Sequence, residues 1–201
     1  MKNYDRYKGS TFNLDDEGVK WVEETKKAMT LEEKIGQLMV PIGYSADLGY
    51  LQHVMLDHHI GGILYRLWGK VKKCRLVTDG FRSTAKSRFL LLQTWKLAVT
   101  ESLYDGTSFG KQMEVAATGD SEQAYRLGKI SCSEGKAVGC NWAFAPVVDI
   151  DRNWRNPITN VRTYGADPEF VLKCGLAYKR GADEENVAVS IKHFPGDGCD
   201  E

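Results

Sequence analysis

Hydrophobic and polar positions follow two periods along this chain, and segments of the two kinds alternate. Apolar residues at helical spacing predict amphipathic helices, and short β-branched runs bounded by glycine or polar residues predict buried strands. The predicted helices cover residues 15–29, 48–59, 121–137 and about 167–184, a further helix begins at Thr30, and the predicted strands cover residues 61–65, 141–150 and 187–193. Each strand is apolar enough to be covered on both faces. This order favours a parallel α/β architecture.

Local signals define two of the helix starts. Thr30 and Glu33 match a capping box, in which the Thr30 hydroxyl accepts the third backbone N–H while Glu33 bonds back to the cap. Residues 167–169 place an acid, a proline and a second acid at the start of another helix, which is typical of a first turn. The apolar face of the helix that begins at Thr30 consists of Leu31, Ile35, Leu38 and Met39.

Polar residues gather directly after two of the predicted strands, at residues 149–155 and 192–200. The carboxyl ends of parallel strands share one rim, where the chemistry of open sheets and (β/α)8 barrels takes place. Lys192 and His193 end the last strand, and Arg162 precedes it in the chain. These donors suit a neutral, polyhydroxylated ligand.

Each rim residue also has a structural interpretation. Asp149 and Asp151 supply acceptors near the rim, but they could instead cap a turn or pair with the arginines that follow them. Arg162 could clamp its own loop. Lys192 and His193 are adjacent, so they point to opposite faces if the strand continues, and one of them could be buried.

Composition narrows the classes of partner. The 201 residues carry 27 basic and 27 acidic side chains, and no basic stripe indicates nucleic-acid binding. No apolar run approaches the roughly 20 residues that a membrane helix needs, and residues 1–16 lack the apolar stretch of a secretory signal. We therefore expect neither a nucleic-acid nor a membrane partner.

The cysteines bear on the cellular compartment. Their number is odd, and none of them forms a Cys-x-x-Cys pair. They are Cys74, Cys132, Cys140, Cys174 and Cys199. Reduced thiols in the cytoplasm are the simplest interpretation, and the pattern does not favour a zinc site.

Five sequence motifs, in order, resemble the N-terminal domain of glycoside hydrolase family 3. They are M-T-L-E-E-K-I-G-Q-L at 29–38, N-W-x-F-A-P-V-V-D-I at 141–150, R-N-x-R-N-P at 152–157, R-x-Y-G at 162–165 and K-H-F-P-G at 192–196. The resemblance covers residues 29–65 and 104–201. The K-H-F-P-G-D-G variant is most similar to the bacterial β-N-acetylhexosaminidase branch.

The resemblance implies a (β/α)8 barrel, of which residues 1–201 would form the N-terminal part, an incomplete barrel with roughly the first five strands. It implies retaining hydrolysis of a β-linked glycoside or amino-sugar substrate, in the metabolism of cell-wall-derived or chitin-type sugars. A β-glucosidase is the alternative within the family. No metal or organic cofactor is implied, because carboxyl and imidazole groups suffice for this reaction.

The resemblance also assigns roles to residues. Arg162, Lys192 and His193 would bind hydroxyls of the sugar at the cleavage point, while Asp149 organises the strand end. Asp151 and Asp197 are further supporting acids. The acid/base His and the nucleophile Asp would lie beyond Glu201, so no residue of the chain receives a catalytic role. A retaining glycosidase needs both groups, and a catalytically inactive barrel fragment is therefore the alternative of a different class.

The segment of residues 67–103 does not fit the pattern. It is basic, contains no proline and shows no clean period, which by itself would suggest a basic surface helix or a nucleic-acid loop. The resemblance halts at Arg66 and resumes at Tyr104. A shifted codon frame for residues 86–103 permits the family-like string I-P-L-S-S-A-A-N-L-E-A-G-G-N-G-I-A. We hypothesise out-of-frame translation between two compensating indels, which would remove a sugar-binding acid; the nucleotide sequence decides this.

A serine hydrolase is the rival enzyme class. Residues 106–110 match the G-x-S-x-G pattern, with Ser108 at its centre. A nucleophile elbow needs a hydrophobic strand immediately before the serine and a helix after it. Residues 100–105 would form a poor strand, so the sequence before Ser108 argues against a serine hydrolase.

Overall fold

The structure is a computed structural model of the chain, and it describes residues 5–9, 12–45, 47–65, 71–84, 90–93 and 106–199. Its described strands form one parallel sheet in the order β1-β2-β3-β4-β5. The strands are β1 (Ile42–Gly43), β2 (Gly62–Tyr65), β3 (Leu90–Gln93), β4 (Trp142–Ala143) and β5 (Ala188–Val189). This is the order that the first five strands of a (β/α)8 barrel take.

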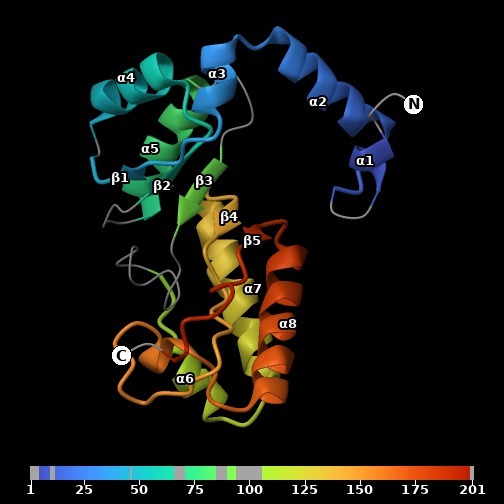
Figure 1. The fold of residues 1–201 in the computed structure, drawn as a ribbon. Coiled ribbons are helices and arrows are strands. Elements are labelled where there is room, and N and C mark those ends of the chain that lie inside the picture. The colour runs from blue at the N-terminus through green and yellow to red at the C-terminus, as the bar shows by residue number, and fades with distance from the viewer. Residues whose placement is uncertain are drawn as a thin grey trace.

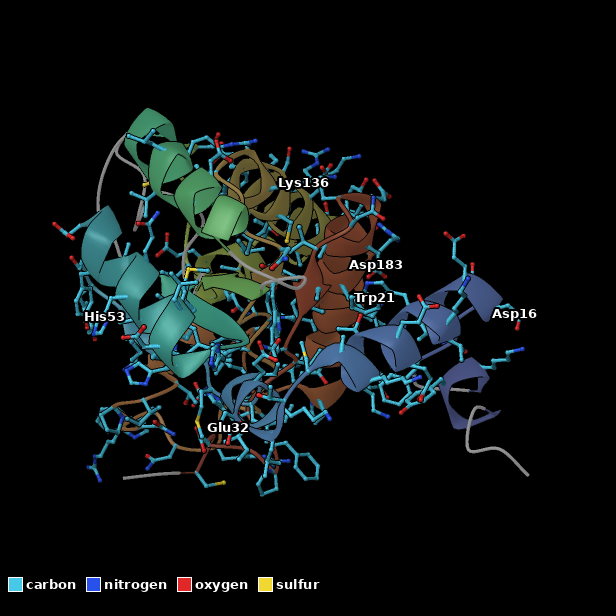
Figure 2. The ribbon with its side chains drawn as sticks, turned by 90° about the horizontal axis from the view of Figure 1, so that it is seen from above. Asp16, Trp21, Glu32, His53, Lys136 and Asp183 are labelled. Atoms are coloured by element: carbon cyan, nitrogen blue, oxygen red, sulfur yellow. The ribbon has the colours of Figure 1, made fainter. Side chains whose placement is uncertain are left out.

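Helices connect successive strands and cover the sheet (Figure 1). The crossovers carry α4 (Leu48–His58), α5 (Val71–Thr84), α6 (Gln112–Ala116) with α7 (Glu122–Ala137), and α8 (Pro168–Glu184), while α1 (Asp5–Lys8), α2 (Asp16–Ala28) and α3 (Leu31–Gly36) precede β1. In both views α2 extends away from the sheet (Figures 1 and 2), and Figure 2 shows Asp16 at its far end. None of the described helices is long and apolar enough to cross a membrane.

The predicted helix starts are confirmed. Thr30 is the N-cap of α3; its hydroxyl accepts the N–H of Glu33 at 3.2 Å, and its own N–H donates to the Glu33 carboxylate at 2.9 Å. Asp167 caps α8, and Pro168 occupies the first turn. Both starts depend on residues close in sequence, which is why the sequence was sufficient to predict them.

The predicted strands at residues 141–150 and 187–193 are too long. In the structure each contributes two residues to the sheet, and the pairing then resumes only as an isolated bridge between Val147 and Lys192. Pro146 has no N–H to donate, so the ladder is interrupted beside it, although its carbonyl still accepts the Lys192 N–H at 3.1 Å.

The apolar face predicted for the helix at Thr30 is exposed, whereas the apolar face of an amphipathic helix is normally buried against the core. Leu31 is 68% and Leu38 is 80% exposed. The opposite side of α3 docks instead, because a Cβ on Gly36 would lie 2.4 Å from the His58 carbonyl oxygen at the end of α4. The Gln37 side chain also donates to the His59 carbonyl at 2.8 Å. This close backbone contact turns the apolar stripe outward.

The described part of the segment 67–103 supplies α5, the helix that connects β2 to β3, and β3 itself. Residues 66–70, 85–89 and 94–105 lie outside the described residues, so only residues 90–93 of the family-like string can be placed. Helix α5 buries Cys74 and Val77 in the core, and its Thr78 hydroxyl donates to the Val138 carbonyl at 2.6 Å. The frameshift hypothesis stays a prediction for the nucleotide sequence.

Helices α7 and α8 pack against each other through glycines. A Cβ on Gly128 would lie 2.3 Å from the Tyr178 carbonyl oxygen, and one on Gly181 would lie 2.5 Å from the Tyr125 carbonyl oxygen. Beside this contact lies a buried cluster that includes Leu127, Cys174 and Tyr178. The backbones of the two helices are therefore in direct contact at these glycines.

We expect Gly128→Ala to destabilise the fold by about 1–3 kcal/mol, because the added methyl group forces the two helix backbones apart. Urea unfolding at constant temperature measures this. Gly49→Ala in the first turn of α4 is the matched control, since its Cβ would meet only an Asp47 carboxylate oxygen, at 3.3 Å. Equal stability of the two variants would contradict the backbone contact.

Candidate functional site

The loops that follow β4 and β5 run side by side at the carboxyl end of the sheet (Figure 1). The N–H of Val148 donates to the Lys192 carbonyl at 2.7 Å, and the N–H of Arg152 donates to the Gly198 carbonyl at 3.0 Å. The two loops are thus joined along their length. The polar clusters predicted at residues 149–155 and 192–200 lie on these loops.

The centre of the site is a carboxylate that holds a histidine ring. Asp149 is 2% exposed, and its Oδ2 lies 2.6 Å from Nδ1 of His193. Its Oδ1 accepts the N–H of Asp197 at 2.8 Å and that of His193 at 3.3 Å. The Asp197 carboxylate lies 3.4 Å from the same ring nitrogen. Because Nδ1 faces the carboxylates, Nε2 is the ring nitrogen left for a ligand.

These contacts keep Asp149 ionised. Burial by itself raises the pKa of the Asp149 carboxyl, but the hydrogen bonds from the Asp197 N–H, the His193 ring and the His193 N–H outweigh burial and lower it below its ordinary value. A buried anion held by three donors fixes the position of the loop that supplies two of them. Asp149 therefore orients His193 and is itself inaccessible to a ligand.

Lys192 and Arg162 each have partners of their own. The Lys192 ammonium lies 5.9 Å from the centre of the Phe144 ring, within cation–π range. Arg162 ends a short 3-10 helix (Asn160–Arg162), and its Nη1 donates to the Ile158 carbonyl at 2.6 Å. Part of the guanidinium thus clamps the loop, while its Nε is buried with no hydrogen-bond partner among the described residues.

Asp151 also presents an unsatisfied group. Its backbone N–H donates to the Gly165 carbonyl at 3.0 Å, but its Oδ1 is buried without a hydrogen-bond partner in the described structure. Within that same set of residues it forms no ion pair with either following arginine, and the Arg155 guanidinium stacks over Trp154 at 4.8 Å instead. Buried polar atoms normally have partners, so the Asp151 oxygen and the Arg162 Nε are atoms that a polar ligand could satisfy.

The structure therefore joins some predicted site residues and not others. Asp149, His193 and Asp197 form one bonded cluster. Arg162 and Lys192 lie on the two joined loops. Arg162 is held by Ile158 of its own loop, whereas Lys192 lies over Phe144, which directly follows β4.

Two supporting residues were not predicted from the sequence. Gln112 of α6 is 3% exposed; its side chain donates to the Val147 carbonyl at 2.9 Å and accepts the Val147 N–H at 3.3 Å, which fixes the approach to Asp149. Asn156 is fully buried and bonds to both loops. The Asn156-Pro157 dipeptide is a turn signal that could have indicated it, whereas Gln112 gives no comparable signal.

The alternative centres receive no support. Among the described residues no group of three or more His, Cys, Asp and Glu side chains could hold a metal ion. After Ser108 the chain stays irregular up to α6, which begins at Gln112, so no helix follows the serine directly as an elbow requires. The residues 94–105 before it lie outside the described part of the chain.

Comparison with known proteins identifies the family of the chain. The family model "Glycosyl hydrolase family 3 N terminal domain" matches residues 30–201. A β-N-acetylglucosaminidase/β-glucosidase of Cellulomonas fimi is 40% identical over 190 residues, which are 94% of this chain and 34% of that protein. The chain thus spans about a third of that relative's length.

Solved structures share the fold. The β-glucoside phosphorylase BglX bound to 2FGlc has a TM-score of 0.89 at 38% identity, over 95% of this chain and 34% of that one. A family 3 β-N-acetylglucosaminidase from Paenibacillus sp. str. FPU-7 has a TM-score of 0.80 at 31% identity, over 85% of this chain and 34% of that one. The parallel sheet is accordingly the incomplete barrel that was expected. The chain belongs to glycosyl hydrolase family 3, whose N-terminal domain it matches from residue 30 to residue 201.

Proposed function

We propose that this chain supplies the sugar-binding part of a retaining β-N-acetylhexosaminidase, which hydrolyses β-linked amino-sugar glycosides. The observation that carries the proposal is the pair of joined loops, which brings a held His193 and the unsatisfied atoms of Arg162 and Asp151 to one end of the sheet. The name of the Cellulomonas fimi relative supports the substrate class. We also propose that the protein acts in the cytoplasm. Four of its cysteines are buried free thiols, which suits a reducing compartment.

The chemistry of the site suits a neutral sugar. Each sugar hydroxyl both donates and accepts, so a ring is held best by donors and acceptors from several directions. His193 Nε2, the Lys192 ammonium and the Arg162 Nε would donate, and the Asp151 Oδ1 would accept. Retaining hydrolysis also needs a nucleophile and an acid/base. The proposal gives neither role to a residue of this chain.

A β-glucoside is the second candidate substrate, with phosphate as a possible attacking group in place of water. The observation that favours it is the likeness to BglX, a β-glucoside phosphorylase, at 38% identity and a TM-score of 0.89. The two reactions are distinguished by their products, since phosphorolysis yields a sugar 1-phosphate and hydrolysis yields the free sugar.

We expect the 201-residue chain to bind methyl β-N-acetylglucosaminide with a dissociation constant on the order of millimolar. Arg162→Ala and His193→Ala should each weaken binding about tenfold, through the loss of a hydrogen bond to a charged or oriented group. Titration followed by NMR measures this, with methyl β-glucoside as the competing ligand. Lys179→Ala is the matched control, because Lys179 is an exposed lysine on α8 that pairs with Asp183.

The outcomes separate the alternatives. Binding of the amino sugar that depends on Arg162 and His193 supports the proposal, and preference for the glucoside supports the second candidate. An absence of binding to either sugar would favour an inactive fragment. Turnover of a nitrophenyl N-acetylglucosaminide by this chain would show that it holds both catalytic groups, contrary to the roles proposed here.

A further inference from the structure

One buried amide stands between the two loops of the site. Asn156 is 0% exposed, and its Oδ1 accepts the N–H of Ile158 at 2.8 Å and that of Thr159 at 3.0 Å. These bonds cap a turn within the loop that follows β4. Its Nδ2 donates to the carbonyl of Asp197 on the loop that follows β5. A single side chain thus satisfies groups on both loops.

The bonds of Asn156 lead directly to the proposed sugar-binding groups. On one side, Asn156 accepts the N–H of Ile158, and the carbonyl of Ile158 accepts a hydrogen bond from Arg162 Nη1 at 2.6 Å. On the other side, Asp197 also donates its N–H to Asp149 at 2.8 Å, and its carboxylate lies 3.4 Å from the His193 ring. Asn156 is therefore one bonded residue away from each group.

Near Asn156 the backbones of the two loops are in direct contact, with no room for an added side chain. The N–H of Arg152 donates to the Gly198 carbonyl at 3.0 Å, and a Cβ on Gly198 would lie 1.9 Å from the Ile150 carbonyl oxygen. Any side chain at this position would push the loops apart. The spacing of the loops thus depends on the amide and on the glycine together.

We infer that Asn156 is a positioning residue, which sets where the His193 loop lies relative to Arg162 and so fixes the geometry of the sugar site. The inference rests on the proposed function in one respect, that a single sugar contacts both loops. An amide is required because the position needs an acceptor for two N–H groups and a donor for a carbonyl. A carboxylate would keep the acceptors but would face the Asp197 carbonyl with a second oxygen.

Asn156→Asp therefore breaks the bond between the loops while keeping the turn. Asn160→Asp is the matched control, because Asn160 is exposed in the same loop and its Oδ1 accepts only a local N–H, that of Val161, at 2.7 Å. Gly198→Ala is the second variant, which separates the loops by steric contact if Asn156→Asp does not fold.

The first readout is amide hydrogen exchange in the 201-residue chain, which needs no ligand. Asn156→Asp should speed exchange about tenfold at Asp197 and Arg152, whose N–H groups bond across the loops, and leave Ile158 and Thr159 nearly unchanged. Gly198→Ala should give the same pattern, and Asn160→Asp should leave all four amides unchanged. Equal exchange at Asp197 and Arg152 in Asn156→Asp and in the unmodified chain would overturn the inference.

The second readout is the dissociation constant for methyl β-N-acetylglucosaminide. Asn156→Asp should weaken binding about tenfold relative to Asn160→Asp. Unchanged binding together with faster exchange would overturn the positioning role. If the unmodified chain does not bind the sugar, the proposed function fails, and the exchange pattern still decides whether Asn156 holds the loops in register.

Discussion

Asp149→Asn is expected to lower the free energy of unfolding by about 2–3 kcal/mol and to abolish measurable sugar binding. The carboxylate accepts from the His193 ring at 2.6 Å and from the Asp197 N–H at 2.8 Å while fully enclosed. Asparagine keeps one acceptor oxygen but presents an amide group where the other oxygen was, so a buried donor loses its partner. Urea unfolding at neutral pH and an NMR titration with the sugar measure the two effects.

The same substitution should change the response to acid. The folded-state pKa of Asp149 lies below its ordinary value of 3.8. A carboxyl with a depressed pKa adds stability above its unfolded pKa, and that stability is lost as the pH falls through the folded pKa. The unmodified chain should therefore lose stability below about pH 5 more steeply than Asp149→Asn does.

Asp167→Asn provides the control for both measurements. Asp167 is an exposed N-cap whose carboxylate accepts the Glu169 N–H at 3.0 Å, and asparagine caps a helix about as well. Its stability should change little. If Asp149→Asn behaves like Asp167→Asn in stability, acid response and sugar affinity, the carboxylate does not hold the loop.

Gln112→Leu is expected to cost roughly 2–3 kcal/mol, although leucine has a similar size and is more apolar. The Gln112 amide pairs with both the N–H and the carbonyl of Val147, as a neighbouring strand would. Leucine leaves these two buried backbone groups unpaired, and each unpaired group has a desolvation cost. Thermal and urea unfolding measure the loss.

The matched control for this prediction is Gln123→Leu on α7. Gln123 donates to the Asp120 carboxylate at 2.9 Å at an exposed position, so its loss should change stability by less than about 0.5 kcal/mol. A similar loss of stability in both variants would mean that the pairing of Gln112 with Val147 adds no more stability than an exposed hydrogen bond does. Because Val147 precedes Asp149 by two residues, we also expect Gln112→Leu to weaken sugar binding.

The features that could be predicted from the sequence were mostly those formed by residues close together in the chain. The caps at Thr30 and Asp167 depend on residues within three positions of each other, and the structure shows both. The polar ends of two strands placed Asp149 and His193 at one rim. Their bond, however, joins residues 44 positions apart, and only the fold determines which carboxylate meets which ring.

Other features were decided by contacts that leave no pattern in the sequence. Strand β1 has only two residues, and pairing with β2 is what defines it as a strand. The outward turn of α3 follows from the approach of Gly36 to the His58 carbonyl. Strand β3 lies in the segment without a hydrophobic period, where sequence reasoning expected no strand from the residues as written.

The joining of the two rim loops has a consequence for the thermodynamics of recognition. Their backbone groups bond to each other, to Asp149 and to Asn156 within the fold itself. The conformational entropy that mobile loops would lose on association is therefore lost during folding, and little ordering remains when a ligand arrives. Under the proposed function, even a small neutral monosaccharide, with few atoms to contribute contact energy, is then retained by a handful of hydrogen bonds.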